Sequence, residues 1–270
     1  MTTVAGPDRF AFGENWRRFL AVIDDHRIHE AERSLVEMLG RPRLDGLRFL
    51  DVGSGSGLFS LAAWRLGATV HSFDFDPASV ACTREMKRRF AGDDARWTVD
   101  RGSALDPDYL KSLGTADIVY SWGVLHHTGA MHRAMKLIAG LVAPGGMLYI
   151  ALYNDQGWQS RGWWFVKRSY NVLPGALHFL IVAPVMLVLW GPRTIVDMIQ
   201  GHPFSTFRDY SSTRGMSAWH DLFDWVGGFP YEVARPDDVM GFYERLGFSL
   251  REIRKRNGLG CNEFVFALER

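Results

Sequence analysis

Short apolar runs alternate with amphipathic segments between residues 47 and 152. Five runs have the length and composition of buried strands, at 47–52, 69–73, 97–99, 118–122 and 147–152. Between them, apolar residues recur at helical spacing, as at Met131, Met135, Ile138 and Val142. Regular alternation of strands and helices predicts an α/β fold whose sheet is doubly wound and mostly parallel, with right-handed crossovers.

Both ends of the chain add to this core. Near the C-terminus, runs at 249–254 and 263–268 flank a glycine-containing turn. This spacing predicts an antiparallel hairpin with a reversed last strand, which brings the sheet to seven strands. At the N-terminus, residues 14–39 predict one or two amphipathic helices that pack on the core.

A long insertion separates the fifth strand from the hairpin, far longer than a normal crossover. Its apolar run at 176–190 is shorter than the ~20 residues needed to span a bilayer, and it contains His178 and Pro184. We therefore do not expect a simple transmembrane helix. A buried cap helix, an interface in a homo-oligomer and a peripheral membrane contact remain open, and we favour the cap or the interface over lipid.

Composition narrows the class of protein. Of the 270 residues, 47% are hydrophobic and 23% charged, which is ordinary for a globular protein, and the net charge of +1 gives no reason to expect nucleic acid as a partner. Two cysteines provide neither a disulfide framework nor a zinc cluster, so no metal is expected. No secretory signal pattern precedes residue 47, and we expect a cytoplasmic protein.

The most informative segment is the end of the first strand, where residues 49–57 run Phe-Leu-Asp-Val-Gly-Ser-Gly-Ser-Gly. Three glycines at alternate positions between a strand and a predicted helix let a ligand approach the backbone closely. A dinucleotide fingerprint would need its last glycine at position 58, where the chain has Leu58. The chain also lacks the lysine-containing loop of nucleoside triphosphatases.

The D-x-G-x-G-x-G pattern at 51–57 resembles motif I of class I S-adenosylmethionine (SAM) methyltransferases. The second strand ends at Asp74, 17 residues after Gly57, close to the separation expected for a carboxylate that reaches a ribose. The resemblance implies a Rossmann-like methyltransferase fold, SAM as cofactor, and Asp74 on the ribose hydroxyls. Asp76 and Pro77 then predict the start of a helix whose residues Cys82, Met86 and Phe90 face the sheet.

The resemblance extends to two other loops. After the third strand, Ser103 and Ala104 are expected to line the adenine site, with serine where many relatives carry an acid. After the fourth strand, Ser121 and Trp122 match the positions that contact the methionine part of SAM. The full set of expected cofactor residues is Asp51, Gly53, Ser54, Gly55, Gly57, Asp74, Phe75, Ser103, Ala104, Ser121 and Trp122, with Trp16 folded over them from the N-terminal helices.

Catalytic and acceptor-binding candidates follow the fourth and fifth strands. His126 and His127 are the candidate general bases, because imidazole titrates near neutral pH. Neighbouring residues seldom point into one pocket, so we expect one histidine to act or orient and the other to pack. Expected to bind the acceptor substrate are Tyr153, Asn154, Trp219 and His220.

The sequence thus predicts a SAM-dependent methyltransferase for a small-molecule or glycan-like acceptor, most simply at oxygen. Alternatives are a lipid-soluble quinone or membrane-associated acceptor, RNA methylation, which the near-neutral charge disfavours, and a SAM-binding protein without catalysis. The predicted divisions are N-terminal helices at 1–46, a SAM-binding core at 47–153, a helical cap forming the acceptor site at 154–245, and the hairpin at 246–270.

Overall fold

The computed structural model describes residues 20, 23–202, 222 and 225–269. The chain divides into a sheet unit, residues 12–156 and 232–270, and an insertion unit, residues 1–11 and 157–231. The chain returns to the sheet unit at Glu232. Helix α12, Pro236–Glu244, then packs its Tyr243 into the core of the sheet.

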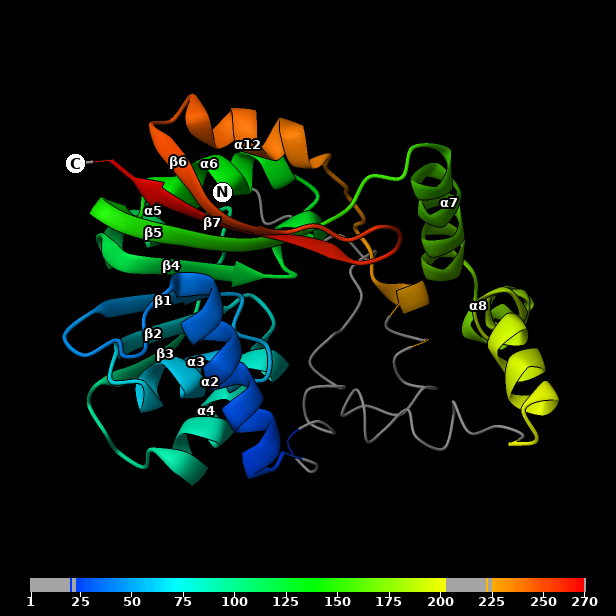
Figure 1. Ribbon diagram of the computed structural model, residues 1–270, viewed down its shortest axis with the longest axis horizontal. Coiled ribbons are helices and arrows are strands. Elements are labelled where there is room, and N and C mark those ends of the chain that lie inside the picture. Colours follow the sequence, from blue (N-terminus) through cyan, green and yellow to red (C-terminus); the bar gives the residue numbers. More distant parts are fainter. Residues whose placement is uncertain (1–19, 21–22, 203–221, 223–224, 270) are drawn as a thin grey trace. The chain divides into compact units, whose positions relative to one another are not determined.

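The sheet unit is built on seven strands in the order β3-β2-β1-β4-β5-β7-β6 (Figure 1). Strands β1 to β5 are parallel, and β7 is antiparallel to both β5 and β6. The bounds are β1 Arg48–Val52, β2 Thr69–Asp74, β3 Trp97–Arg101, β4 Ala116–Trp122, β5 Val142–Tyr153, β6 Phe248–Arg254 and β7 Cys261–Leu268. The predicted mostly parallel seven-stranded sheet with its terminal hairpin is confirmed.

Helices cover both faces of this sheet. The alternation of side chains along β1 sends Phe49 into one core and Leu50 and Val52 into the other. The first core is closed by α2 Asp25–Leu39, α3 Leu58–Arg65 and α4 Pro77–Phe90, and the second by α5 Pro107–Leu113, α6 Met131–Ala139 and α12 Pro236–Glu244. The burial of both faces explains why the parallel strands appear in the sequence as continuous apolar runs.

Helix α4 begins as predicted. The Asp76 carboxylate accepts a hydrogen bond from the Ala78 N–H at 2.9 Å, and Pro77 occupies the first turn. Cys82 and Met86 are buried against the sheet, as expected. Phe90 is exposed instead, because it lies in the last turn of the helix, beyond the edge of the apolar core.

A buried chain of polar side chains lies behind the glycine turn. Trp97 Nε1 donates to Ser72 Oγ at 2.8 Å, Ser72 and Ser60 share a hydrogen bond of 2.7 Å, and Ser60 Oγ donates to Asp51 Oδ2 at 2.5 Å. With Asp51 ionised, every hydroxyl has a partner and points toward the carboxylate. Burial nevertheless raises the pKa of Asp51 to about 7, although the Ser60 hydrogen bond acts in the opposite direction.

The insertion unit contains α7 Trp158–Val172 and α8 Phe179–Ile199 (Figure 1). A small core joins the two helices through Tyr170, Val182, Val185 and Trp190. At its side, the buried Lys167 ammonium lies 4.3 Å from the centre of the Trp225 ring and 5.0 Å from that of Tyr231.

Helix α8 corrects the length argument made from the sequence. The helix has 21 residues and continues through Pro184 and Pro192. The segment Gly175–Ile199 is long and apolar enough to cross a membrane, and only 11% of its most apolar window is buried. The cap, the oligomer interface and the membrane contact all stay predictions.

The raised pKa of Asp51 predicts a pH-dependent stability. A carboxyl that ionises less readily when folded stabilises the protein fully below pH ~4, and this contribution is lost as pH rises through ~7. Asp51→Asn should remove the dependence, so the difference in unfolding free energy between wild type and variant should change by up to about 4 kcal/mol between pH 4 and pH 8. Urea unfolding at several pH values measures it.

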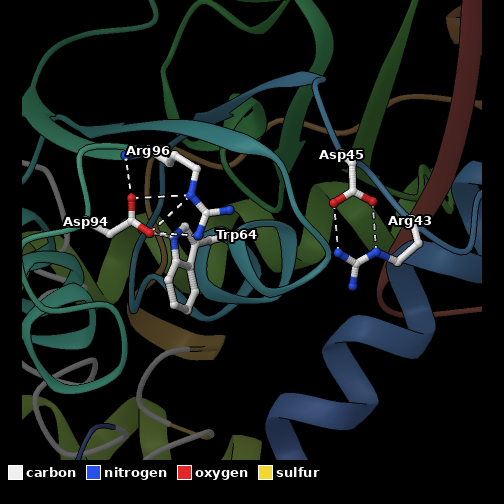
Figure 2. A network of polar contacts seen from close by, with 5 residues as sticks. All are labelled: Arg43, Asp45, Trp64, Asp94 and Arg96. Atoms are coloured by element: carbon white, nitrogen blue, oxygen red, sulfur yellow. Dashed lines mark hydrogen bonds and ion pairs between the residues drawn. The ribbon is translucent and has the colours of Figure 1, made fainter.

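Asp94→Asn is the matched control. Figure 2 shows the Asp94 carboxylate held by Arg96 and the Trp64 indole. The Arg96 hydrogen bonds lower the pKa of Asp94 to about 2, so its contribution is lost only as pH falls toward 2 and is constant between pH 5 and 8. Parallel pH curves for wild type and Asp51→Asn would show that Asp51 ionises normally.

Candidate functional site

The glycine turn links the ends of β1 and β2 through backbone hydrogen bonds. The N–H groups of Gly53 and Ser54 both donate to the Phe73 carbonyl, at 2.8 and 3.1 Å. One residue further along β2, the Asp74 carboxylate accepts from the Gly55 N–H at 3.0 Å. The turn is thus held against β2, and the carboxylate lies beside its central glycine.

Two of the glycines are required by their surroundings as well as by their backbone angles. Gly53 has φ +82°, and a Cβ there would lie 2.5 Å from the methyl groups of Val124. Gly57 has φ +81°, and its Cβ would lie 3.0 Å from the backbone of Thr83 on α4. The turn therefore packs too closely against its neighbours to accept a larger residue.

Asp74 holds two loops at once. Its carboxylate accepts from the N–H groups of Gly55 and Asp76, and its carbonyl accepts from Gly102 after β3. Burial raises the pKa of Asp74 to about 6, although the Gly55 hydrogen bond lowers it. The backbone hydrogen bonds from Gly55, Asp76 and Phe75 leave acceptor capacity on a carboxylate with about four lone-pair sites, as the predicted ribose contact needs. That contact stays a prediction.

The other expected cofactor residues fall into two groups. Ser54, Ser103 and Ser121 use their hydroxyls within the protein: Ser54 with Thr83, Ser103 as acceptor from Leu105, and Ser121 as donor to the Val52 carbonyl. Any ligand contact from them would use the backbone or the remaining lone pairs. Two others have exposed side chains: Phe75, directly after β2, and Trp122, the last residue of β4.

Ala104 is buried in the loop after β3, and Asp51 lies behind the turn in the buried polar chain. Trp16, from the N-terminal segment, lies outside the described residues. The carboxyl ends of β1 to β4 thus bring together the cofactor residues expected from the described part of the chain, with Asp51 beneath them rather than at the edge.

Sequence reasoning missed two residues that shape this edge. The Thr83 hydroxyl lies 2.9 Å from Ser54 Oγ and 3.2 Å from the Gly55 carbonyl, so α4 supports the turn directly. Tyr109 packs edge-on against Phe73 and fills the space beside Gly102, where a Cβ would lie 2.0 Å from its ring. Neither residue belongs to a recognisable motif, although the Asp106-Pro107 helix start does place Tyr109 in the first turn of α5.

The two histidines have different surroundings. His126 is fully buried, and its Nδ1 accepts a hydrogen bond from the Tyr153 N–H at 3.3 Å. An accepting Nδ1 places the proton of the neutral ring on Nε2. The ring also stacks on Tyr153, with 3.8 Å between centroids. His126 therefore has the environment of a packing residue.

His127 is half-buried and lies beside this stack, 4.4 Å from the His126 ring and 5.4 Å from the Tyr153 ring between centroids. The arrangement matches the expectation that one histidine packs and the other remains for chemistry. It favours His127 as the catalytic candidate, a role that stays a prediction.

The loop that carries the histidines is fixed by the chain returning from the insertion. Glu232 donates its N–H to the His126 carbonyl at 3.0 Å, and its carboxylate accepts from Met131 N at the start of α6. Burial raises the pKa of Glu232. Ala234 then donates to the Tyr153 carbonyl at 3.0 Å. Glu232 has no local sequence signal because its partners lie about a hundred positions away.

Of the expected acceptor residues, Tyr153 lies against both histidines, and Asn154 holds the hairpin loop. The Asn154 amide donates to the carbonyls of Arg256 and Gly258 and accepts from Asn262. Trp219 and His220 lie outside the described residues. Within the described part of the chain, no group of His, Cys, Asp and Glu could hold a metal ion.

Strand order reverses at β1, which lies between β2 and β4, and ligands of open α/β sheets bind beyond the carboxyl ends at such a point. The glycine turn, Asp74 and the Gly102 loop all lie there. This fold, with its reversed last strand, is that of the class I SAM-dependent methyltransferases. A profile of the methyltransferase domain family matches residues 23–178, more than half of the chain, so the protein belongs to this family.

Individual relatives agree with this assignment. The ubiquinone biosynthesis O-methyltransferase of Rhizobium rhizogenes is 33% identical over 137 residues, 50% of this chain and 51% of that protein. Its Escherichia coli counterpart is 29% identical over 143 residues, 52% of this chain and 53% of that protein. The chain thus spans about half the length of these curated relatives.

Solved structures show the same fold at low identity. Magnesium protoporphyrin IX methyltransferase from Synechocystis, solved with bound SAH, aligns with 95% of this chain and 94% of its own, at TM-score 0.56 and 14% identity. An O-methyltransferase family protein from Burkholderia thailandensis aligns with 83% of this chain and 51% of its own, at TM-score 0.52 and 16% identity.

Substitution at Gly53 tests how closely the turn is packed. Gly53→Ala should cost about 1–2 kcal/mol for its positive φ and a further 1–3 kcal/mol for the contact with Val124. Gly46→Ala is the matched control, because Gly46 has φ +74° with no atom within 4 Å of a Cβ. Urea unfolding of both variants separates the two costs. Equal losses would mean that Val124 moves aside freely.

Proposed function

We propose that this protein transfers the methyl group of SAM to an oxygen of a small-molecule acceptor. The observation that carries the proposal is the joining of Gly55 and Asp74 at the point where strand order reverses. The glycine backbone lies there beside the Asp74 carboxylate, and the exposed ring of Phe75 follows Asp74 in the chain. The membership of the methyltransferase domain family supports it.

The residues at this edge suit SAM. Asp74 would accept from the ribose hydroxyls, the glycine turn would lie against the amino-acid part, and the loop at Ser103 and Ala104 would border the adenine. SAM supplies an electrophilic methyl group on a sulfonium. On transfer, the bond from methyl to sulfur would break as the bond to the acceptor oxygen forms, which would leave the thioether S-adenosylhomocysteine.

The protein's own part is positioning and proton removal. A hydroxyl acceptor loses its proton as its oxygen is methylated, and His127, which follows β4, would take that proton. His126 and Tyr153 form the stack that supports His127. Alignment of acceptor and methyl supplies much of the rate in such displacements, so the base adds to a reaction that positioning already favours.

A lipid-soluble acceptor is the second candidate. The insertion unit exposes large apolar side chains on α7 and α8, among them Trp158, Phe165 and Leu187. The matched relatives are called ubiquinone biosynthesis O-methyltransferases, and this name indicates a quinone-type acceptor for them. Methyl-labelled SAM incubated with the protein and separated aqueous and lipid extracts decides between the candidates. Binding of SAM without label in either extract would indicate a SAM-binding protein that does not catalyse transfer.

Cofactor affinity provides the first test. Asp74→Asn keeps the size of the side chain but removes the charge and replaces an acceptor, so SAM affinity should fall by about 10- to 100-fold. Asp94→Asn, with its partners on the surface, should bind as wild type. Calorimetric titration with SAM and with S-adenosylhomocysteine measures both. Unchanged affinity in Asp74→Asn, with the fold intact, would remove the ribose assignment.

The two histidines should respond differently to replacement. His127→Ala should lower kcat by about 100-fold with SAM affinity unchanged, because a base is lost. His126→Ala should lower the free energy of unfolding by about 2 kcal/mol or more, because it leaves the Tyr153 N–H unpaired and a cavity behind it. Steady-state kinetics, calorimetry and urea unfolding on both variants test the assignment. Full turnover in His127→Ala would show that proton removal needs no base.

A further inference from the structure

Helix α8 exposes an apolar surface to solvent. Its exposed positions are apolar except for Arg193, and the most prominent are Phe179, Leu187, Val188, Ile195, Met198 and Ile199. The buried positions Val182, Val185 and Trp190 contact the small core of the insertion unit. The helix is thus apolar on the face that packs and on the face that does not.

Helix α7 presents a stripe of a different kind. Trp158, Phe165 and Val172 are exposed and seven residues apart, so they lie on one line along the helix. Arg161 and Arg168 are also seven apart and follow a neighbouring line. A tryptophan and arginines side by side form the combination that favours the boundary between lipid headgroups and acyl chains.

The exposed charge of these helices has one sign. Between residues 157 and 202, the exposed charged side chains among Asp, Glu, Lys and Arg are Arg161, Arg168 and Arg193. The acidic Asp197 and the basic Lys167 are both buried. Anionic lipid headgroups complement such a surface. In a dimer formed through this face, the arginines of the two copies would approach one another. Residues 157–202 have no exposed carboxylate to pair with them.

The pairing of strands in the sheet limits how α8 can bind a bilayer. The helix is about 31 Å long, enough to cross the hydrocarbon layer. However, α8 lies between β5 and β7 in the chain, and these two strands are hydrogen-bonded neighbours in the sheet. A single crossing would place them on opposite sides of the membrane. A second crossing lacks a candidate among the described residues, and the sequence at 203–231 is interrupted by charges.

We infer that α7 and α8 dock this protein on one leaflet of an anionic lipid bilayer. The exposed face of α8 enters the acyl region, and Arg161 and Arg168 contact the headgroups. The inference concerns lipid binding alone and does not depend on the proposed methyl transfer, because it is measured without SAM or acceptor.

Flotation of the full-length protein with lipid vesicles tests this inference. One set of vesicles contains phosphatidylcholine alone, and the other has about a third of it replaced by phosphatidylglycerol. The wild type should float with the anionic vesicles and bind the neutral ones at least tenfold more weakly. Carbonate at high pH should release the bound protein, as expected for attachment to one leaflet.

Leu187→Glu with Val188→Glu places two charges on the inserted face and should lower binding to the anionic vesicles by at least tenfold. Leu246→Glu with Leu259→Glu is the matched control, because these leucines are exposed apolar residues of the sheet unit. Arg161→Gln with Arg168→Gln should reduce the dependence of binding on salt, whereas Arg41→Gln with Arg251→Gln should not.

Three results would overturn the inference: no flotation of wild type, equal binding by the α8 variant and its control, or retention after carbonate treatment. A dimer in solution that Leu187→Glu with Val188→Glu dissociates, without any vesicle binding, would assign the face to a second copy. Loss of lipid binding with methyl transfer intact would separate this surface from the proposed function.

Discussion

The hydrogen bond from the Gly55 N–H to the Asp74 carboxylate joins the parts on which this site depends. It holds the glycine turn of β1 against the end of β2, and the Asp74 carbonyl extends the connection to Gly102 after β3. Three loops from separate strands thereby become one edge. Because Gly53 and Gly57 have no space for a Cβ, neighbouring groups fix the turn from both sides.

Two carboxylates of this region have raised pKa values for the same reason, burial, and serve different ends. Asp51 ends a buried chain of hydrogen bonds that runs from Trp97 through Ser72 to Ser60 on α3. Asp74 lies at the edge, where backbone N–H groups favour its ionised form. Asp51 thus lies in the packing behind the glycine turn, and Asp74 lies at the edge that a ligand would contact.

The insertion has its own core and its own chemistry. Its two helices pack through a small cluster around Trp190 and leave apolar and basic side chains outside. So continuous an exposed apolar face typically marks a surface that another molecule covers. Because β5 and β7 are hydrogen-bonded neighbours, a single crossing of a membrane by α8 would separate two paired strands.

Local patterns in the sequence determined the strands, the glycine turn, the Asp76 cap and the fold class, because each depends on residues near one another in the chain. The sequence also placed Asp74 at the edge, since spacing along a βαβ unit is regular. It could not separate His126 from His127, or find Thr83, Tyr109 and Glu232, whose partners are distant in sequence. Nor could it show which face of α8 is covered, because burial is decided only when the chain has folded.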